Sequence, residues 1–241
     1  MSNDTPSDDT RNVATRVAAL YDVHGNLPAL EAVLAEMRRE AVDCVVVGGD
    51  VVPGPMALEA LRLLRALDVP THFVRGNCES AVLAARRGDP LARLPAAVRE
   101  TMRWTAEQLR SEDEQLLATW PLTIELDVRG LGRVLFCHAT PRNDDEIFTR
   151  LTREEVLLPI FAPLGAGLVV CGHTHMPFDR MVGATRVVNA GSVGMPFGEP
   201  GADWLFLGPG VEPRHTAYDL EAAAARIRAT SYPQAAEFAD R

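Results

Sequence analysis

The sequence predicts an α/β protein, and three observations support this prediction. Short apolar runs rich in Val and Leu alternate with longer segments whose apolar residues recur at helical spacing. The first three runs are each followed by a polar loop and a helical pattern, the order typical of parallel strands joined by right-handed crossovers. Polar side chains follow most of the strand ends, where ligands gather in an open α/β sheet.

The predicted strands are short apolar runs bounded by glycine or polar residues. They cover residues 16–21, 43–47, 71–74, 123–128, 133–137, 168–170, 186–188, 203–207 and 211–218. The runs at 123–128 and 133–137 flank a glycine-containing segment, residues 129–132, which predicts a hairpin.

The first two predicted helices follow the first two strands. Pro28 suits a first helical turn, and the second helix is expected from about residue 55 to 67. The residues expected to be buried are Leu30, Val33, Leu34 and Met37 in the first helix, and Ala60, Leu64 and Leu67 in the second.

Residues 80–120 are helical in pattern and contain no predicted strand. Ser111 followed by Glu114 is the signature of a capping box that opens a short helix. The segment is either ordinary packing or a lid beside a functional site, and the pattern leaves both alternatives open. One helical face carries Leu94, Val98, Met102, Thr105 and Leu109.

Two more helices are predicted further along the chain. Thr152 and Glu155 form another capping box, and Pro159 is expected to kink or end the helix that follows. A C-terminal helix should begin near Asp219, and its predicted buried residues are Ala222, Ala225 and Ile227.

We therefore expect a single domain over residues 15–230, with a helical insertion at 80–120. The polar segment 1–14 is expected to be disordered, and residues 231–241 to form a loose tail. No transmembrane run and no apolar signal-peptide core is evident, so we expect a cytoplasmic protein with no membrane partner. A homo-oligomer is compatible with the sequence.

The formal net charge of -9 argues against binding of long nucleic acid, which favours a basic face. It does not exclude a small anionic substrate, because bound cations dominate the field near them. Among the four cysteines, Cys44, Cys137 and Cys171 lie in or beside apolar strands and are expected to be buried small hydrophobes. Cys78 alone falls in a polar motif, and no spacing indicates disulfides or a cysteine zinc site.

Metal-capable side chains recur at the predicted strand ends. Each taken alone has a structural explanation, such as a turn, a helix cap or a core histidine, but their joint occurrence favours a metal centre. Two carboxylates, four imidazoles and one amide exceed the needs of one four-coordinate ion and suit two bridged ions. Nitrogen and oxygen donors without thiolate favour Mn, Fe or Zn. The residues are Asp22, His24, Asp50, Asn77, His138, His173 and His175.

Three of these residues directly follow a glycine, namely Gly49, Gly76 or Gly172. Glycine allows a sharp turn and a close backbone approach, so it can aim the next side chain inward.

The order and spacing of these motifs, over about residues 16–218, resemble those of the calcineurin-like metallophosphoesterases. The matching motifs are Asp22-x-His24, Gly49-Asp50, Gly76-Asn77, His138 and Gly172-His173-x-His175. The segments at 22–34, 77–79 and 189–194 are similar to those of the small bacterial and archaeal branch, often called YfcE-like.

The resemblance implies a four-layer sandwich, in which two mixed β-sheets pack face to face between helices. It also implies two divalent ions, for which we expect Mn²⁺ first, with Fe or Zn as alternatives. Asp50 would bridge the ions. The first site would comprise Asp22, His24 and His175, and the second Asn77, His138 and His173.

The sequence departs from the commoner family pattern at Cys78, where most members carry a histidine that assists the leaving group. A thiol is a poor substitute for an imidazolium acid, although the YfcE-like branch has the same cysteine. Cys78 is therefore a candidate catalytic residue beside Asp50, and substrates with leaving groups of low pKa should suffer least from the change.

The expected reaction is hydrolysis of a small phosphoester, nucleotide-like in kind, by attack of a metal-bridging hydroxide on phosphorus. Phosphodiesters are the expected substrates, and phosphomonoesters are an alternative. Arg142 is a candidate phosphate ligand, or else a surface arginine paired with Asp144 or Asp145. Asn26 is a second candidate, or else a helix cap.

His72 and His215 lie within strands and are interpreted as structural. Two alternative functions are a non-catalytic scaffold of the same fold that binds proteins, and a nuclease of the same superfamily. The full ligand set argues against the scaffold, because converging buried polar groups are costly.

Overall fold

The computed structural model describes residues 13–240. The predicted disorder of residues 1–14 falls mostly outside this range, but Ala14 is described and forms a parallel bridge with Val128. Within residues 13–240, no helix combines the length and apolar character needed to cross a membrane.

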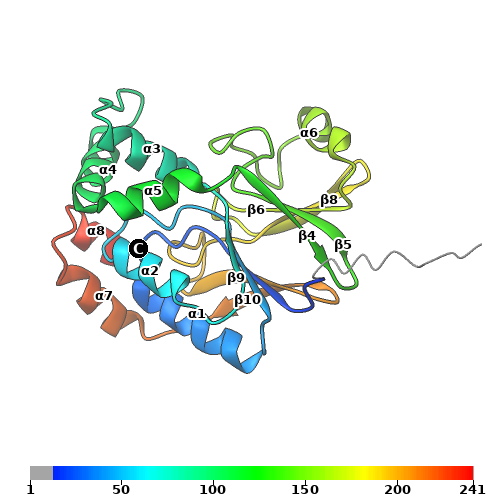
Figure 1. Ribbon diagram of the computed structural model, residues 1–241, viewed down its shortest axis with the longest axis horizontal. Coiled ribbons are helices and arrows are strands. Elements are labelled where there is room, and N and C mark those ends of the chain that lie inside the picture. The colour runs from blue at the N-terminus through cyan, green and yellow to red at the C-terminus, as the bar shows by residue number, and fades with distance from the viewer. Residues whose placement is uncertain (1–12, 241) are drawn as a thin grey trace, which may run out of the picture.

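Two five-stranded mixed sheets form the centre of the molecule (Figure 1). The first has the order β10-β9-β1-β2-β3, and its three N-terminal strands are parallel, as predicted. Its strands are β1 (Val17–Leu20), β2 (Cys44–Val47), β3 (Thr71–Phe73), β9 (Ala202–Leu207) and β10 (Val211–Thr216).

The second sheet has the order β4-β5-β6-β8-β7. The predicted hairpin is the antiparallel pair β4 and β5, and β5, β6 and β8 run parallel. The edge strand β7 was not predicted, because its residues mix charged and apolar side chains without a clean apolar run. The strands are β4 (Thr123–Val128), β5 (Gly132–Cys137), β6 (Leu168–Cys171), β7 (Phe178–Val182) and β8 (Thr185–Asn189).

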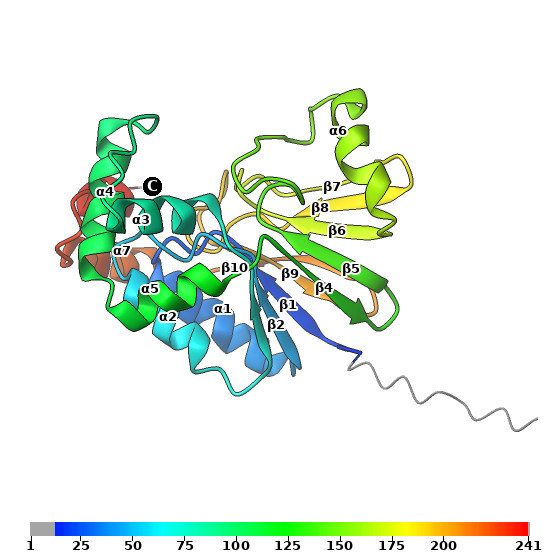
Figure 2. The same ribbon diagram turned by 45° about the horizontal axis from the view of Figure 1, so that its top comes forward.

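Side-chain alternation along the strands divides the core into separate layers. Val17 and Ala19 of β1 point between the sheets, whereas Ala18 and Leu20 pack against helices. In the second sheet, Val170 faces the first sheet and Val169 faces the helical side. The result is the helix, sheet, sheet, helix order of a four-layer sandwich, in which α6 covers the outer face of the second sheet (Figure 2).

The described helices are α1 (Leu27–Arg39), α2 (Ala57–Arg65), α3 (Asn77–Arg86), α4 (Ala96–Gln108), α5 (Ser111–Thr119), α6 (Glu154–Phe161), α7 (Leu220–Arg228) and α8 (Ala235–Ala239), with a 3₁₀ turn at Ala162–Leu164. The apolar stripe predicted for α1 is buried throughout. In α2, Ala60 and Leu64 are buried, but Leu67 lies beyond the helix end and is half-buried.

Both predicted capping boxes are wrong in detail. The helix α5 does begin at Ser111, but the carboxylate of Asp113 accepts the N–H of Arg110, so the cap lies one residue earlier. The helix α6 begins at Glu154, and the hydroxyl of Thr152 instead accepts the N–H of Thr149 in a preceding turn. Pro159 lies inside α6, which continues to Phe161.

The C-terminal region also differs from the prediction. The helix α7 begins after Asp219, as expected, and Asp219 caps it. Ile227 is buried as predicted, but Ala223 is the other buried residue, and Ala222 and Ala225 are exposed. The expected loose tail beyond Ser231 contains the helix α8. Aromatic contacts anchor this segment, because the ring of Tyr232 packs edge-on against those of Trp104 and Phe238.

Candidate metal centre

The sequence-predicted metal ligands lie at the carboxyl ends of strands from both sheets. Asp22 and His24 follow β1, and Asp50 follows β2. From the second sheet, His138 follows β5, and the His173 and His175 pair follows β6. Asn77 begins α3 after β3. Because the sheets pack face to face, these ends meet in one place.

An unusual backbone conformation marks five of these residues. Asp22, His24, Asp50, His173 and His175 have φ angles of 54°, 46°, 54°, 67° and 57°. Non-glycine residues rarely adopt this left-handed region, and such strain clusters at functional sites, where surrounding contacts must maintain it.

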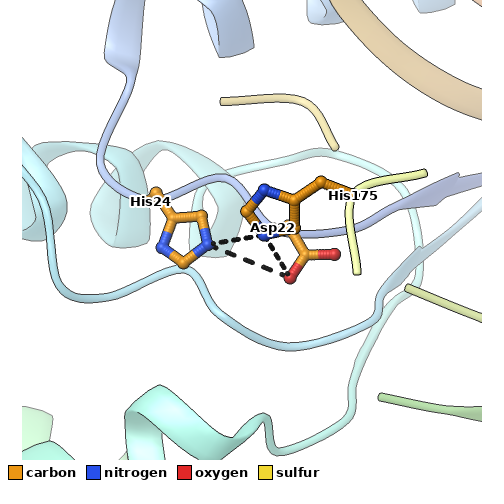
Figure 3. Close-up of side chains that lie close together, drawn as sticks. All are labelled: Asp22, His24 and His175. Atoms are coloured by element: carbon orange, nitrogen blue, oxygen red, sulfur yellow. Dashed lines mark hydrogen bonds and ion pairs between the residues drawn. The ribbon is translucent and has the colours of Figure 1, made fainter. Parts of the chain in front are cut away.

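The first group comprises Asp22, His24 and His175 (Figure 3). The Nε2 atoms of His24 and His175 lie 3.1 Å apart. The Oδ1 of Asp22 lies 3.4 Å from the Nε2 of His175 and 3.9 Å from the Nε2 of His24. Three potential metal-ligand atoms therefore lie close together, as they would around a single ion.

The second group contains Asp50, Asn77 and His138. The Nε2 of His138 is 3.0 Å from the Oδ1 of Asn77, 3.6 Å from the Oδ1 of Asp50 and 3.9 Å from the Oδ1 of Asp22. The ring centroids of His173 and His138 lie 5.1 Å apart. Asp50 spans both groups, since its Oδ2 is 3.8 Å from the Nε2 of His24.

The donor atoms suit metal ions. The Oδ1 of Asp22 is buried and has no hydrogen-bond partner. In His138 and His175, Nδ1 lies 2.9 Å and 2.8 Å from the carbonyls of Gly48 and Met195. A carbonyl only accepts, so Nδ1 must donate, which leaves Nε2 as the ligand atom in the neutral ring. An unpartnered carboxylate oxygen beside oriented imidazoles fits a divalent cation.

The groups also perturb one another's pKa values. Burial raises the pKa of Asp22, but His175, His138 and His24 outweigh burial and hold it well below its usual range. Burial and the neighbouring His175 lower the pKa of His24 to about 4, so its ring is neutral at pH 7. Burial lowers the pKa of His175, but Asp22 reverses the shift and raises it. A metal therefore competes with a proton for His175.

Most of this chain matches the model of a known protein family. Residues 16–207 match the model of the calcineurin-like phosphoesterase superfamily domain. This chain belongs to that superfamily. The sequence is 29% identical, over 75% of this chain and 71% of the other, to the uncharacterized protein MJ0912 of Methanocaldococcus jannaschii.

Two solved structures show the same fold. The metallophosphoesterase of Sphaerobacter thermophilus is 27% identical, with a TM-score of 0.74, and the match covers 94% of this chain and 98% of that one. Yfce, a phosphoesterase of E. coli, is 20% identical with a TM-score of 0.50, over 84% of this chain and all of the other. The predicted family and four-layer sandwich are thus confirmed.

The glycines before the ligands of this calcineurin-like domain mainly provide space. A Cβ on Gly76 would lie 2.2 Å from the Oδ1 of Asp50, and one on Gly172 would lie 2.5 Å from the Oδ2 of Asp22. Of the three, Gly49 alone has a left-handed φ, of 95°. The predicted close approach is present at all three positions, but the ligand residues themselves make most of the sharp turns.

Glu79 has a structural role that no local sequence pattern indicates. Its buried carboxylate accepts four backbone N–H groups, at 2.8 to 3.2 Å. Oε2 takes those of Asp50 and Gly76, and Oε1 takes those of Val51 and Val52. Glu79 therefore ties the loop after β2 to the loop after β3, and so sets the positions of Asp50 and Asn77.

Cys78 is buried beside the second group. Its N–H donates to the Oδ1 of Asp50 at 2.9 Å, and its Sγ lies within 4.8 Å of donor atoms of His24 and Asp50. Burial and the charge of Asp50 raise the pKa of the Cys78 thiol well above its ordinary value. Bound cations would act in the opposite direction.

The two predicted phosphate contacts occupy structural positions. Asn26 is buried and caps α1 by accepting the N–H of Ala29, and its Nδ2 donates to the carbonyl of Gly194. Arg142 is exposed and pairs through two nitrogens with Glu146, rather than with Asp144 or Asp145. Both amide ends of Asn26 are therefore engaged, and Arg142 would have to leave Glu146 to reach a substrate.

Proposed function

We propose that this protein hydrolyses phosphoesters, diesters in particular, with two divalent transition-metal ions, of which Mn²⁺ is the first candidate. The observation that carries the proposal is the unpartnered Oδ1 of Asp22, which lies 3.4 to 3.9 Å from the Nε2 atoms of three predicted histidine ligands. Those histidines are His24, His138 and His175, and the other predicted ligands lie beside them. Membership of a phosphoesterase superfamily supports it. The same evidence supports a metal-dependent phosphoric ester hydrolase more broadly.

The roles follow from the two groups. Asp22, His24 and His175 would hold the first ion, and Asn77, His138 and His173 the second. Asp50 would contact both, because its two oxygens face different histidines. Bound ions would supply Lewis acidity and lower the pKa of a water. The chain's own contribution is to orient the imidazoles and to keep the carboxylate of Asp22 ionised.

A purely structural scaffold is a weaker explanation of these residues. Strained backbone at five ligand positions and a buried carboxylate oxygen without a partner both cost folding free energy. A binding surface elsewhere on the fold would not need them. The net charge of -9 likewise disfavours long nucleic acid as the substrate.

Protein purified without chelator should contain up to two transition-metal ions per chain. Chelator-treated protein should be inactive on bis(p-nitrophenyl) phosphate and should regain activity with Mn²⁺, or to a different degree with Zn²⁺, Fe²⁺ or Mg²⁺. Elemental analysis and the hydrolysis assay measure the two quantities. Fewer than one ion per chain, with no gain of activity on adding Mn²⁺, would contradict the proposal.

We expect Cys78→Ala to change the hydrolysis rate only within a few-fold, because neither form of the thiol is a useful acid. A thiol of raised pKa holds its proton, and a thiolate has none to give. Rates should be measured on two diesters, one with a good and one with a poor leaving group. Cys78→His should raise the rate on the poor one.

A loss of about 10²-fold or more in Cys78→Ala, confined to the poor leaving group, would instead identify Cys78 as the acid. Circular dichroism of both variants would show whether the fold is retained.

A further inference from the structure

A cavity of about 660 Å³ opens beside Asn77 and Cys78, between the helical insertion and the loop after β5. We propose that this α4 pocket receives the leaving group of the phosphoester, and that this group is uncharged and carries a ring, as a nucleoside or an aryl group does. The inference rests on the proposed function and narrows its substrate class. The lining residues are Asn77, Cys78, Ser80, Ala81, residues 89–94, Val98, Met102, Asp144 and Asp145.

The position of the α4 pocket relative to the metal ligands indicates what it holds. Asn77, a proposed ligand of the second ion, and Cys78, whose Sγ lies near Asp50 and His24, form one end of the pocket. A phosphoryl group held by the ligands would therefore direct one ester oxygen past Cys78. In hydrolysis, water adds hydroxide to phosphorus and supplies a proton to the departing oxygen. The substituent on that oxygen would lie in the pocket.

The walls of the α4 pocket are largely apolar. Ala81 of α3 faces the pocket together with Leu91, Leu94, Val98 and Met102 of the insertion. Leu94 precedes α4 and Val98 lies one turn before the buried Met102 within it, and both Leu94 and Val98 are half-buried. A ring placed against them would remove further apolar surface from water, and the volume lies within the range of small-molecule sites.

The charge of the α4 pocket disfavours a leaving group that already carries a negative charge of its own in the bound substrate. Asp89, Asp144 and Asp145 line it together with one guanidinium, that of Arg93. The hydroxyl of Ser80 donates to Asp144 at 2.6 Å, which holds this carboxylate at the pocket wall. Carboxylates in excess repel a second phosphate or a carboxylate, but they accept hydrogen bonds from the hydroxyl or amino groups of a neutral ring compound.

A paired substitution tests the role of the α4 pocket. Val98 and Ala97 occupy the first turn of α4, where an added carboxylate suits the helix dipole, but Val98 lines the pocket and Ala97 is exposed outside it. Metal-loaded full-length protein is assayed on methyl p-nitrophenyl phosphate and on methyl acetyl phosphate, with methyl phosphate release followed by ³¹P NMR. The two substrates share the methyl group and differ in the size of the leaving group.

We expect Val98→Asp to lower the ratio of kcat/KM for the aryl over the acetyl substrate by about tenfold or more, because a carboxylate must be desolvated against the ring. Ala97→Asp should keep the wild-type ratio. Should circular dichroism show that Val98→Asp does not fold, Val98→Trp, which narrows the pocket, replaces it with the same expectation.

An unchanged ratio in the folded Val98 variant, with active wild-type protein, would overturn the inference about the α4 pocket and leave the proposed function standing. Wild-type protein that hydrolyses neither substrate in the presence of metal would overturn both.

Discussion

Replacing Asp50 with asparagine should lower phosphoester hydrolysis on the order of 10³-fold or more, because its carboxylate faces both groups of ligands. Its oxygens lie 3.6 Å and 3.8 Å from the Nε2 atoms of His138 and His24. An asparagine is nearly the same size, but it offers one neutral oxygen and an N–H₂ that repels cations. The loss should appear in kcat with saturating Mn²⁺, and elemental analysis should show reduced metal content.

Histidines outside the centre provide the controls for this experiment. His72 is exposed on β3, and His215 on β10 bonds to Asp203 at 2.7 Å. His72→Ala and His215→Ala should therefore leave kcat close to that of the wild type. Equal losses in all three variants, with the fold retained, would mean that the centre lies elsewhere.

The location of the candidate site could be predicted from the sequence, because metal-capable residues directly follow apolar runs. The ends of neighbouring parallel strands meet in space, so local patterns were sufficient to bring Asp22 and Asp50 together. His138 follows β5 of the second sheet and joins them only because the two sheets pack face to face. The four layers came from the family resemblance, since local patterns do not specify how two sheets pack.

Other features depend on contacts that local patterns do not encode. The capping boxes were misplaced because several polar side chains near a helix start compete for the same N–H groups, and neighbouring turns decided the outcome at Thr152. The alanines buried in α7 differ from the predicted ones because alanine occurs on both the buried and the exposed face of a helix. Glu79 was missed as a structural element because three of its four backbone partners lie 27 to 29 residues away.

The carboxylate of Glu79 is also the basis of the largest expected effect on stability. Glutamine in its place retains one oxygen and turns an N–H₂ toward a pair of backbone N–H donors. Those two buried donors lose their acceptor, at a cost of about 1–3 kcal/mol each. Relief of the buried charge offsets part of that cost. We therefore expect Glu79→Gln to lower the free energy of unfolding by about 2–4 kcal/mol.

The pH of the measurement matters for this variant. Burial and the charge of Asp50 raise the pKa of Glu79 to about 7, against the lowering effect of its backbone hydrogen bonds. Since this pKa lies above that of an unfolded glutamate, the group's own contribution to stability falls as the pH rises through about 7. Urea denaturation at pH 8.5 in chelator therefore compares glutamine with the ionised side chain, at the pH least favourable to the wild type.

A matched control is Glu107→Gln, an exposed position on α4, which should change the free energy of unfolding by no more than about 0.5 kcal/mol. Because Glu79 holds the N–H groups of Asp50 and Gly76 through one oxygen, its variant should also gain less stability from added Mn²⁺ than the wild type does. A Glu79→Gln protein as stable as the Glu107→Gln control, with an undiminished gain from Mn²⁺, would show that the four hydrogen bonds do not position the ligand loops.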